Sequence, residues 1–281
     1  MVMRAAPQLW RQPSVYSVIV FACEPLFLTN VSEKTNIPEG DKMKKTIHRN
    51  DTRGHAAHGW LDTCHTFSFA NYYDPERLQF GALRVLNDDS VQPGMGFGKH
   101  PHDNMEIITI PLFGDLEHKD SIGNEGVIKE GDVQVMSAGK GIFHSEKNHN
   151  RDKEVKFLQI WVLPNKQDVE PRYDQISIRE LSVPNQFYQI LSPNSEDQGV
   201  WIHQYAWFFM ADLEAGKSAS YKLNGDHHGV YLFVIEGQVK LVGEVLNKRD
   251  GIGLREIESV TVEASEDSCL LLMEVPVSKK D

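Results

Sequence analysis

The chain has 281 residues, of which 40% are hydrophobic, and 29 Lys and Arg against 40 Asp and Glu give a formal net charge of −11. This length allows one large domain or two of ordinary size, each with a sizeable core. The acidic balance argues against a nucleic-acid surface, which needs a basic stripe, so we expect no direct nucleic-acid partner.

Residues 1–42 differ in composition from the rest of the chain. A mildly basic stretch precedes the apolar run VYSVIVFACEPLFL, which Glu24 and Pro25 interrupt. The run is shorter than the about 20 apolar residues of a transmembrane helix, so we expect no membrane span. The order of basic then apolar residues suggests a secretory leader, but no small-residue cleavage site follows. Because Met43 opens like an ordinary start, we interpret residues 1–42 as an extension of doubtful structure, through a mis-set start codon, with a leader as the alternative.

Residues 43–163 are predicted to form a β-barrel domain. Short runs rich in β-branched and aromatic residues alternate with turn-forming residues such as Asn87 and Gly114. We expect strands over residues 78–86, 105–113, 131–137 and 155–163. Many short strands without a long amphipathic helical run are typical of an all-β barrel or a double-sheet jelly roll.

A second series of β-type runs follows after a linker predicted at residues 164–193. We expect its strands over residues 187–192, 201–213, 229–243, 251–257, 259–264 and 269–275. The segment VIEGQVKL at 234–241 parallels PLFGDLEH at 111–118, as two copies of one hairpin would. The sequence therefore predicts two related β-barrels, the second over residues 194–277.

Two short pairs of residues are the most informative feature of the first half. His100 and His102 are separated by one residue, as are His144 and Glu146. Residues two apart on a strand share a face, so two strands can aim three imidazoles and one carboxylate at one point. Nitrogen and oxygen ligands of this kind suit first-row divalent metals and leave coordination positions open. We therefore predict that these four residues bind one metal ion.

The residues around these pairs resemble a known family. Gly94, His100, His102, Glu106 and Gly114 have the spacing of the first cupin motif. The second motif departs from the common form, with Ser137 in place of proline, two extra residues before its histidine, and Glu146 as a ligand. The segments HGWLDTCHTFSFANYYDP at 58–75, GFGKHPHDNMEI at 96–107 and MSAGKGIFHSE at 136–146 resemble the pirin family, close to its bacterial quercetinase-like branch. The resemblance extends from Met43 to Val277 and implies a bicupin with two jelly-roll-like barrels.

The second barrel lacks the ligands of the first. With Gly237 aligned to Gly114, the positions of the first motif fall on Leu223, Gly225 and Gly229, none of which can bind a metal. We interpret the neighbouring His227 and His228 as solvated turn histidines. The metal site is therefore expected in the N-terminal barrel only.

Other polar residues near the predicted site have two interpretations each. Glu106 lies four residues after His102, so on a continuous strand it would share the ligand face, either as an acceptor behind the ligands or as a structural residue. His55, His58 and His65 lack a strand period as a set, and we assign them a structural role.

The resemblance implies a metal-dependent dioxygenase that opens the ring of a flavonol such as quercetin with O2. Glu146 would accept the proton of the substrate hydroxyl. One divalent metal per chain is expected, Fe(II) first, with Ni, Cu, Mn or Zn as alternatives. The alternative function, as for eukaryotic pirins, is an iron-containing redox sensor that modulates a protein partner. We expect a monomer. Cys23, Cys64 and Cys269 are too few and too widely spaced for a disulfide framework, so we expect the protein in the reducing cytoplasm.

Overall fold

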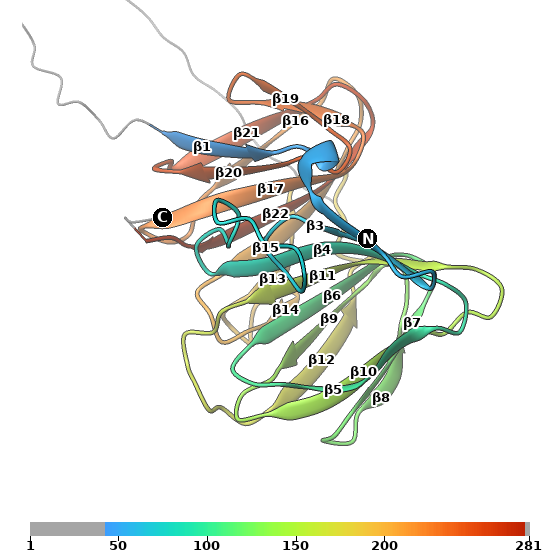
Figure 1. Cartoon of the computed structure of the whole chain (residues 1–281). Helices are drawn as coiled ribbons and strands as arrows, with labels where there is room; N and C mark the ends of the chain where they lie inside the picture. Colours follow the sequence, from blue (N-terminus) through green and yellow to red (C-terminus); the bar gives the residue numbers. More distant parts are fainter. Residues whose placement is uncertain (1–42, 279–281) are drawn as a thin grey trace, which may run out of the picture. The chain divides into compact units, whose positions relative to one another are not determined.

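The computed structural model describes residues 43–278, so the predicted extension of residues 1–42 lies outside the described residues. Within residues 43–278 the regular elements are strands, apart from the short 3-10 helix η1 (Asn50–Thr52). The prediction of an all-β fold is confirmed. The strands form four sheets, which belong in pairs to two barrels (Figure 1).

The first barrel combines a seven-stranded and a four-stranded sheet. The large sheet has the order β12 (Arg172–Ser177), β9 (Asp132–Ser137), β6 (Glu106–Phe113), β11 (Val155–Val162), β4 (Leu83–Val91), β3 (Leu61–His65) and β2 (Gly54–Ala57). The small sheet has the order β5 (Gly96–His102), β10 (Ile142–Asn148), β7 (Leu116–Asp120) and β8 (Glu125–Ile128). All the neighbouring pairs among these strands are antiparallel.

The second barrel repeats this division into a large and a small sheet. Its large sheet has the order β1 (Lys44–His48), β20 (Gly251–Arg255), β17 (His228–Glu236), β22 (Ser268–Pro276), β15 (Trp207–Leu213), β13 (Tyr188–Ser192) and β14 (Val200–Trp201). Its small sheet has the order β16 (Ser218–Lys222), β21 (Ser259–Ala264), β18 (Gln238–Leu241) and β19 (Glu244–Asn247).

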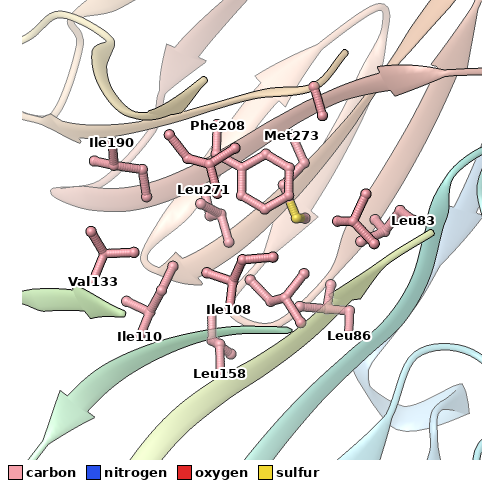
Figure 2. Packing of buried hydrophobic residues seen from close by; sticks show 14 of the residues in the cluster. Leu83, Leu86, Ile108, Ile110, Val133, Leu158, Ile190, Phe208, Leu271 and Met273 are labelled. Carbon is pink, nitrogen blue, oxygen red and sulfur yellow. The ribbon is translucent and has the colours of Figure 1, made fainter. Parts of the chain in front are cut away.

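A hydrophobic cluster joins the two large sheets. Alternate residues of a strand face opposite sides of its sheet. On β4, β6 and β11 the side chains of Leu86, Ile108 and Leu158 therefore point away from the interior of the first barrel and belong to this cluster. Phe208 and Met273, from β15 and β22, meet them from the second barrel (Figure 2). Each fully buried side chain of this size stabilises the fold by about 1.5–3 kcal/mol. The barrels therefore share a core rather than a linker alone.

The interiors of the two barrels differ in polarity. The second barrel encloses a cluster of buried apolar residues that includes Val234, Leu246 and Val262. The first barrel buries Thr109, His118, His144, Glu146 and Gln159 above a smaller apolar base. Buried polar groups need partners to offset their lost hydration, so this polar interior is a candidate site.

Some strands lie elsewhere than the sequence suggested. Strand β1, near the start of residues 43–163, pairs with β20 of the second barrel (Figure 1). Residues 164–193 contain β12, which pairs with β9 of the first barrel, and β13, which pairs with β15 of the second. The run expected as one strand over 201–213 is divided into the end of β14 and β15, with residues 202–206 between them.

Candidate metal centre

Strands β5 and β10 bring the two predicted ligand pairs together. In their antiparallel register His100 lies opposite His144, and Phe97 lies opposite Glu146. The register shifts between His144 and Glu146, as at a β-bulge, which re-aims side chains locally. Gly96 permits this close approach, because a Cβ there would lie 2.2 Å from the carbonyl oxygen of Glu146.

Three imidazoles converge at this point. The ring centroid of His144 lies 4.4 Å from that of His100 and 4.8 Å from that of His102, and the last two are 4.9 Å apart. Nε2 of His144 is 3.0 Å from Nε2 of His100. Nδ1 of His100 donates to the carbonyl oxygen of Gly98 at 2.7 Å, which leaves the lone pair on Nε2. The imidazole nitrogens are thus directed as metal ligands require.

Burial favours the neutral form of His102 and His144, which is the form that binds metals. Burial, together with the neighbouring His100 and His102, lowers the pKa of His144 to about 2. It likewise lowers the pKa of His102 to about 4, with His100 adding to the shift. Three rings packed together cannot all carry a proton at neutral pH, so the cluster favours a cation other than a proton.

Glu146 lies beside the imidazoles and is 3% exposed. Burial raises the pKa of its carboxyl to about 7, against hydrogen bonds from Gln159 and Thr109 that lower it. Gln159 Nε2 donates to its oxygens at 2.9 and 3.2 Å, and Thr109 Oγ1 donates at 3.4 Å. The donor set of neutral imidazoles and one carboxylate fits a divalent first-row metal.

The four predicted ligands are divided between two overlapping groups, one of which also contains His118. His100, His102 and His144 have ligand atoms within 4.8 Å of one another, and so do His118, His144 and Glu146. His144 belongs to both groups. The carboxylate of Glu146 is thus grouped with His118, a residue that the sequence analysis did not select. The signal available was His118-x-Asp120, a histidine and an acid at strand spacing after Gly114.

Glu106 lies on another strand face than the imidazoles. The chain turns at Asn104, where φ is +44°, so β5 ends before Glu106 begins β6. Its carboxylate accepts a hydrogen bond from Ser137 at 2.6 Å, and Arg172 lies close enough to lower its pKa. The strand therefore does not continue from His102 to Glu106, and of the two interpretations given to Glu106 the structure supports the structural one.

A pocket of about 390 Å³ opens at the side of the first barrel. Its lining includes His58, Phe69, Tyr72 and Phe97, together with the polar side chains of His65 and Asp89. The Phe69 ring contacts Trp161 at 5.3 Å between centroids, and Trp161 contacts His102 at 4.9 Å. None of the four predicted ligands lines this pocket, but two of its lining residues lie near Glu146. Phe97 is opposite Glu146 in the strand register, and Asp89 is close enough for Glu146 to raise its pKa. The size of the pocket falls within the usual range for small-molecule sites.

The histidines of the second barrel are placed differently from each other. His227 is exposed in a turn with φ +59°, as expected. His228 contradicts the expectation of a solvated turn residue: its side chain is 8% exposed and its Nδ1 lies 2.8 Å from Oε1 of the buried Glu274. Glu274 accepts further hydrogen bonds from Tyr221 and from the backbone of Asn224 and Gly225. This network connects the turn before β17 to the strand β22.

The potential metal groups of the described residues all lie between His55 and Glu146. The third of them, His55, Asp62 and Cys64, lies on the hairpin of β2 and β3, with His55 and Asp62 exposed. The described part of the chain has no helix long and apolar enough to cross a membrane.

Two β-barrels of this topology, antiparallel apart from the pair β13 and β14 and joined through their large sheets, define a bicupin. The chain belongs to the pirin family. The family model described as Pirin matches residues 46–162, and that of the quercetinase C-terminal cupin domain matches residues 189–275. The resemblance stated from the sequence is thus confirmed.

Several related proteins align with most of the length of this chain. A protein of Escherichia coli K12 named quercetin 2,3-dioxygenase is 38% identical over 234 residues, which cover 82% of this chain and 98% of that protein. A pirin-like protein of Caulobacter vibrioides is 40% identical over 225 residues, covering 80% and 96%. The crystal structure of the bacterial pirin YhhW from E. coli in complex with nickel(II) has a TM-score of 0.79 at 37% identity, covering 84% of this chain and 100% of that one.

Proposed function

We propose that this protein is a metal-dependent dioxygenase that acts on flavonol-type substrates. The observation that supports it is the convergence of three imidazoles, of which that of His144 also lies close to the buried carboxylate of Glu146, in a barrel that has a pocket lined by aromatic side chains. The name of the E. coli relative, quercetin 2,3-dioxygenase, agrees with this chemistry. The nickel(II) in the related YhhW structure agrees with a divalent metal in a centre of this kind.

His100, His102, His144 and Glu146 would hold one divalent metal, and we propose Fe(II) as the ion in the cell. When bound, such a metal supplies the Lewis acidity and the one-electron chemistry that a reaction of an aromatic substrate with O2 requires. All four side chains come from the adjoining strands β5 and β10, and a site on paired strands is held more rigidly than one on loops.

Glu146 would take the proton of the substrate hydroxyl. A base is most effective when its pKa lies near the working pH, and burial raises the pKa of this carboxyl to about 7. Gln159 and Thr109 hold the carboxylate through hydrogen bonds, so that it is oriented before substrate arrives. Loss of the hydroxyl proton gives an electron-rich anion, the form of a flavonol that reacts with O2.

The pocket at the side of the barrel would receive the flat rings of the substrate. Phe69, Tyr72 and Phe97 offer ring faces and edges, while His65 and Asp89 offer hydrogen-bonding groups for ring hydroxyls. Asp89 accepts a hydrogen bond from Thr63, and burial raises its pKa to about 7. An apolar pocket with a few convergent polar groups suits a polyhydroxylated aromatic compound.

The test joins metal content to turnover in the purified full-length protein. We expect about one metal equivalent per chain by elemental analysis, and O2-dependent consumption of quercetin by the Fe(II) form. His102→Ala should bind the metal more weakly and lose turnover, and His144→Ala should lose both the metal and turnover. His149→Ala, which removes an exposed histidine, should lose neither. Undiminished metal in both site variants would contradict the ligand assignment. Full metal without flavonol turnover would favour the regulatory alternative.

A further inference from the structure

His118 is a buried histidine beside the predicted ligands, and the proposed function gives it no role. Strand β7 pairs with β10 so that His118 lies opposite Glu146 and Asp120 lies opposite His144. Directly opposed residues of an antiparallel pair share a face, so His118 and Asp120 face the barrel interior with these two residues. The side chains of His118 and Asp120 are both 0% exposed.

Asp120 determines which nitrogen of His118 carries the proton. Nε2 of His118 lies 3.4 Å from Oδ2 of Asp120, which can only accept, so Nε2–H donates. Asp120 is held in turn by the backbone amides of Ile122 and Asn124 and by the side chain of Asn124. A neutral imidazole protonated on Nε2 has its lone pair on Nδ1. That Nδ1 atom is buried and has no hydrogen-bond partner.

A metal fits between His118, His144 and Glu146. Their ligand atoms lie within 4.8 Å of one another, a separation that bonds of about 2.0–2.2 Å to a common metal can span after small rotations. Nε2 of His144 lies near His100, while its Nδ1 is buried without a hydrogen-bond partner. One ring therefore has a nitrogen for each of the two groups. Two imidazoles and a carboxylate are the donor set of many non-haem Fe(II) oxygenases.

We propose that the first barrel contains a second, inner metal position formed by His118, His144 and Glu146. It takes a divalent first-row cation in alternation with the outer position, the one proposed above for His100, His102, His144 and Glu146. Both positions use His144, and two dications at such a short distance repel each other, so one cation is bound at a time. The inference rests on the proposed function only in that both need a metal in this barrel.

The full-length double variant H100A/H102A isolates the inner position, because it keeps His118, His144 and Glu146. We expect this variant to bind about one equivalent of Co(II), with visible d–d absorption from the bound ion. Adding His118→Ala should weaken Co(II) binding by at least about 10-fold, the lower end of what loss of a group at a metal site costs. Adding His149→Ala instead removes an exposed histidine and should leave binding at the level of the double variant.

Two results would overturn the inner position. One is a double variant that is folded by circular dichroism and binds no Co(II). The other is a triple variant with His118→Ala that binds Co(II) as tightly as the double variant. His118→Gln is measured in parallel, since it keeps a polar side chain in the interior if alanine disturbs folding, and it should also weaken binding. Flavonol turnover of the unsubstituted protein is measured separately, so its absence would count against the proposed function and not against the inner position.

Discussion

At the scale of single residues, two glutamates of the first barrel show how the neighbouring groups give the same type of side chain different roles. Burial raises the pKa of both Glu146 and Glu106 to about 7. Glu146 accepts hydrogen bonds from an amide and a hydroxyl and lies among imidazoles. Glu106 accepts a bond from Ser137 and lies near Arg172. We therefore expect different consequences when each is changed to glutamine.

Glu146→Gln should separate metal binding from proton transfer. Glutamine keeps the size and one oxygen donor of glutamate but cannot accept a proton at neutral pH. We expect flavonol turnover of the metal-loaded variant to fall by about 100-fold or more, the usual scale for loss of a general base, with a smaller loss of metal. The measurement compares turnover per bound metal with that of the unsubstituted protein. Equal turnover per metal would exclude the role as a base.

Glu106→Gln should change the pH dependence of stability rather than the metal content. The folded-state pKa of about 7 exceeds the unfolded value of about 4.3, so unfolding releases a proton between these values. This contribution to stability is complete below about pH 4.3 and is lost as pH rises through 7. The variant should therefore gain about 2 kcal/mol relative to the unsubstituted protein between pH 5 and pH 8.

Urea unfolding of the metal-free proteins at the two pH values measures this difference. Ser137→Ala is the matched control, because it removes the hydrogen bond and leaves the titrating carboxylate. A difference between Glu106→Gln and the unsubstituted protein that stays constant from pH 5 to pH 8 would contradict the prediction.

At the scale of elements, the buried carboxylate of Glu274 on β22 connects this strand to the start of β17 in the second barrel. Burial alone would raise the pKa of Glu274, but hydrogen bonds from His228, Tyr221 and the backbone of Asn224 and Gly225 outweigh it and lower the pKa. The network fixes the turn before β17 against β22. A polar cluster in one barrel thus stabilises a strand end, while a polar cluster in the other is suited to bind a cation.

His228→Ala should destabilise the protein, and His227→Ala should not. Removing His228 leaves the buried Glu274 one partner short, which costs about 1–3 kcal/mol in free energy of unfolding. His227 is exposed, so its loss should change stability by less than about 0.5 kcal/mol. Metal content should stay the same in both variants. Loss of a metal equivalent in His228→Ala would show that the second barrel holds a site of its own.

The sequence predicted the strands and the ligand pairs through local patterns. A period of two places His100 with His102 and His144 with Glu146 on shared faces, and β-branched runs define most strands. It did not predict contacts that depend on strand register. His118 meets Glu146 only because β7 pairs with β10, and His228 meets Glu274 only because β17 lies beside β22. The assignment of a turn to His227 and His228 was half right, since the turn ends between them.

At the scale of the whole molecule, the two barrels depend on one shared core. Leu86, Ile108 and Leu158 of the first barrel are buried only with the second barrel in place, since they face Phe208 and Met273 (Figure 2). Exposing this cluster would create a contiguous apolar patch, of a kind that soluble monomers rarely present. The second barrel is therefore expected to support the site without contributing a ligand.

Truncation after Leu163 should give an insoluble or aggregating first barrel, although all four predicted ligands remain. The fragment loses β12 as well as the second barrel, so a fragment that ends after Ile178 and keeps β12 is the control. We expect both fragments to aggregate and to bind a hydrophobic dye, because each exposes the shared core. A soluble, folded longer fragment would contradict this and assign the defect to the missing edge strand.

The pairing of β1 with β20 also constrains how the protein is made. Lys44–His48 leaves the ribosome before every other described strand, yet its partner, Gly251–Arg255, follows near the end of the chain. At about 5–20 residues per second the first strand waits roughly 10–40 s for that partner. During this interval the strands from β2 to β12 can already pair with one another. The strand β1, on the N-terminal side of β2, has no partner until β20 has been made, and its backbone edge stays unpaired. The large sheet of the second barrel therefore combines strands from both ends of the described chain, and it cannot be completed before Gly251–Arg255 has been made.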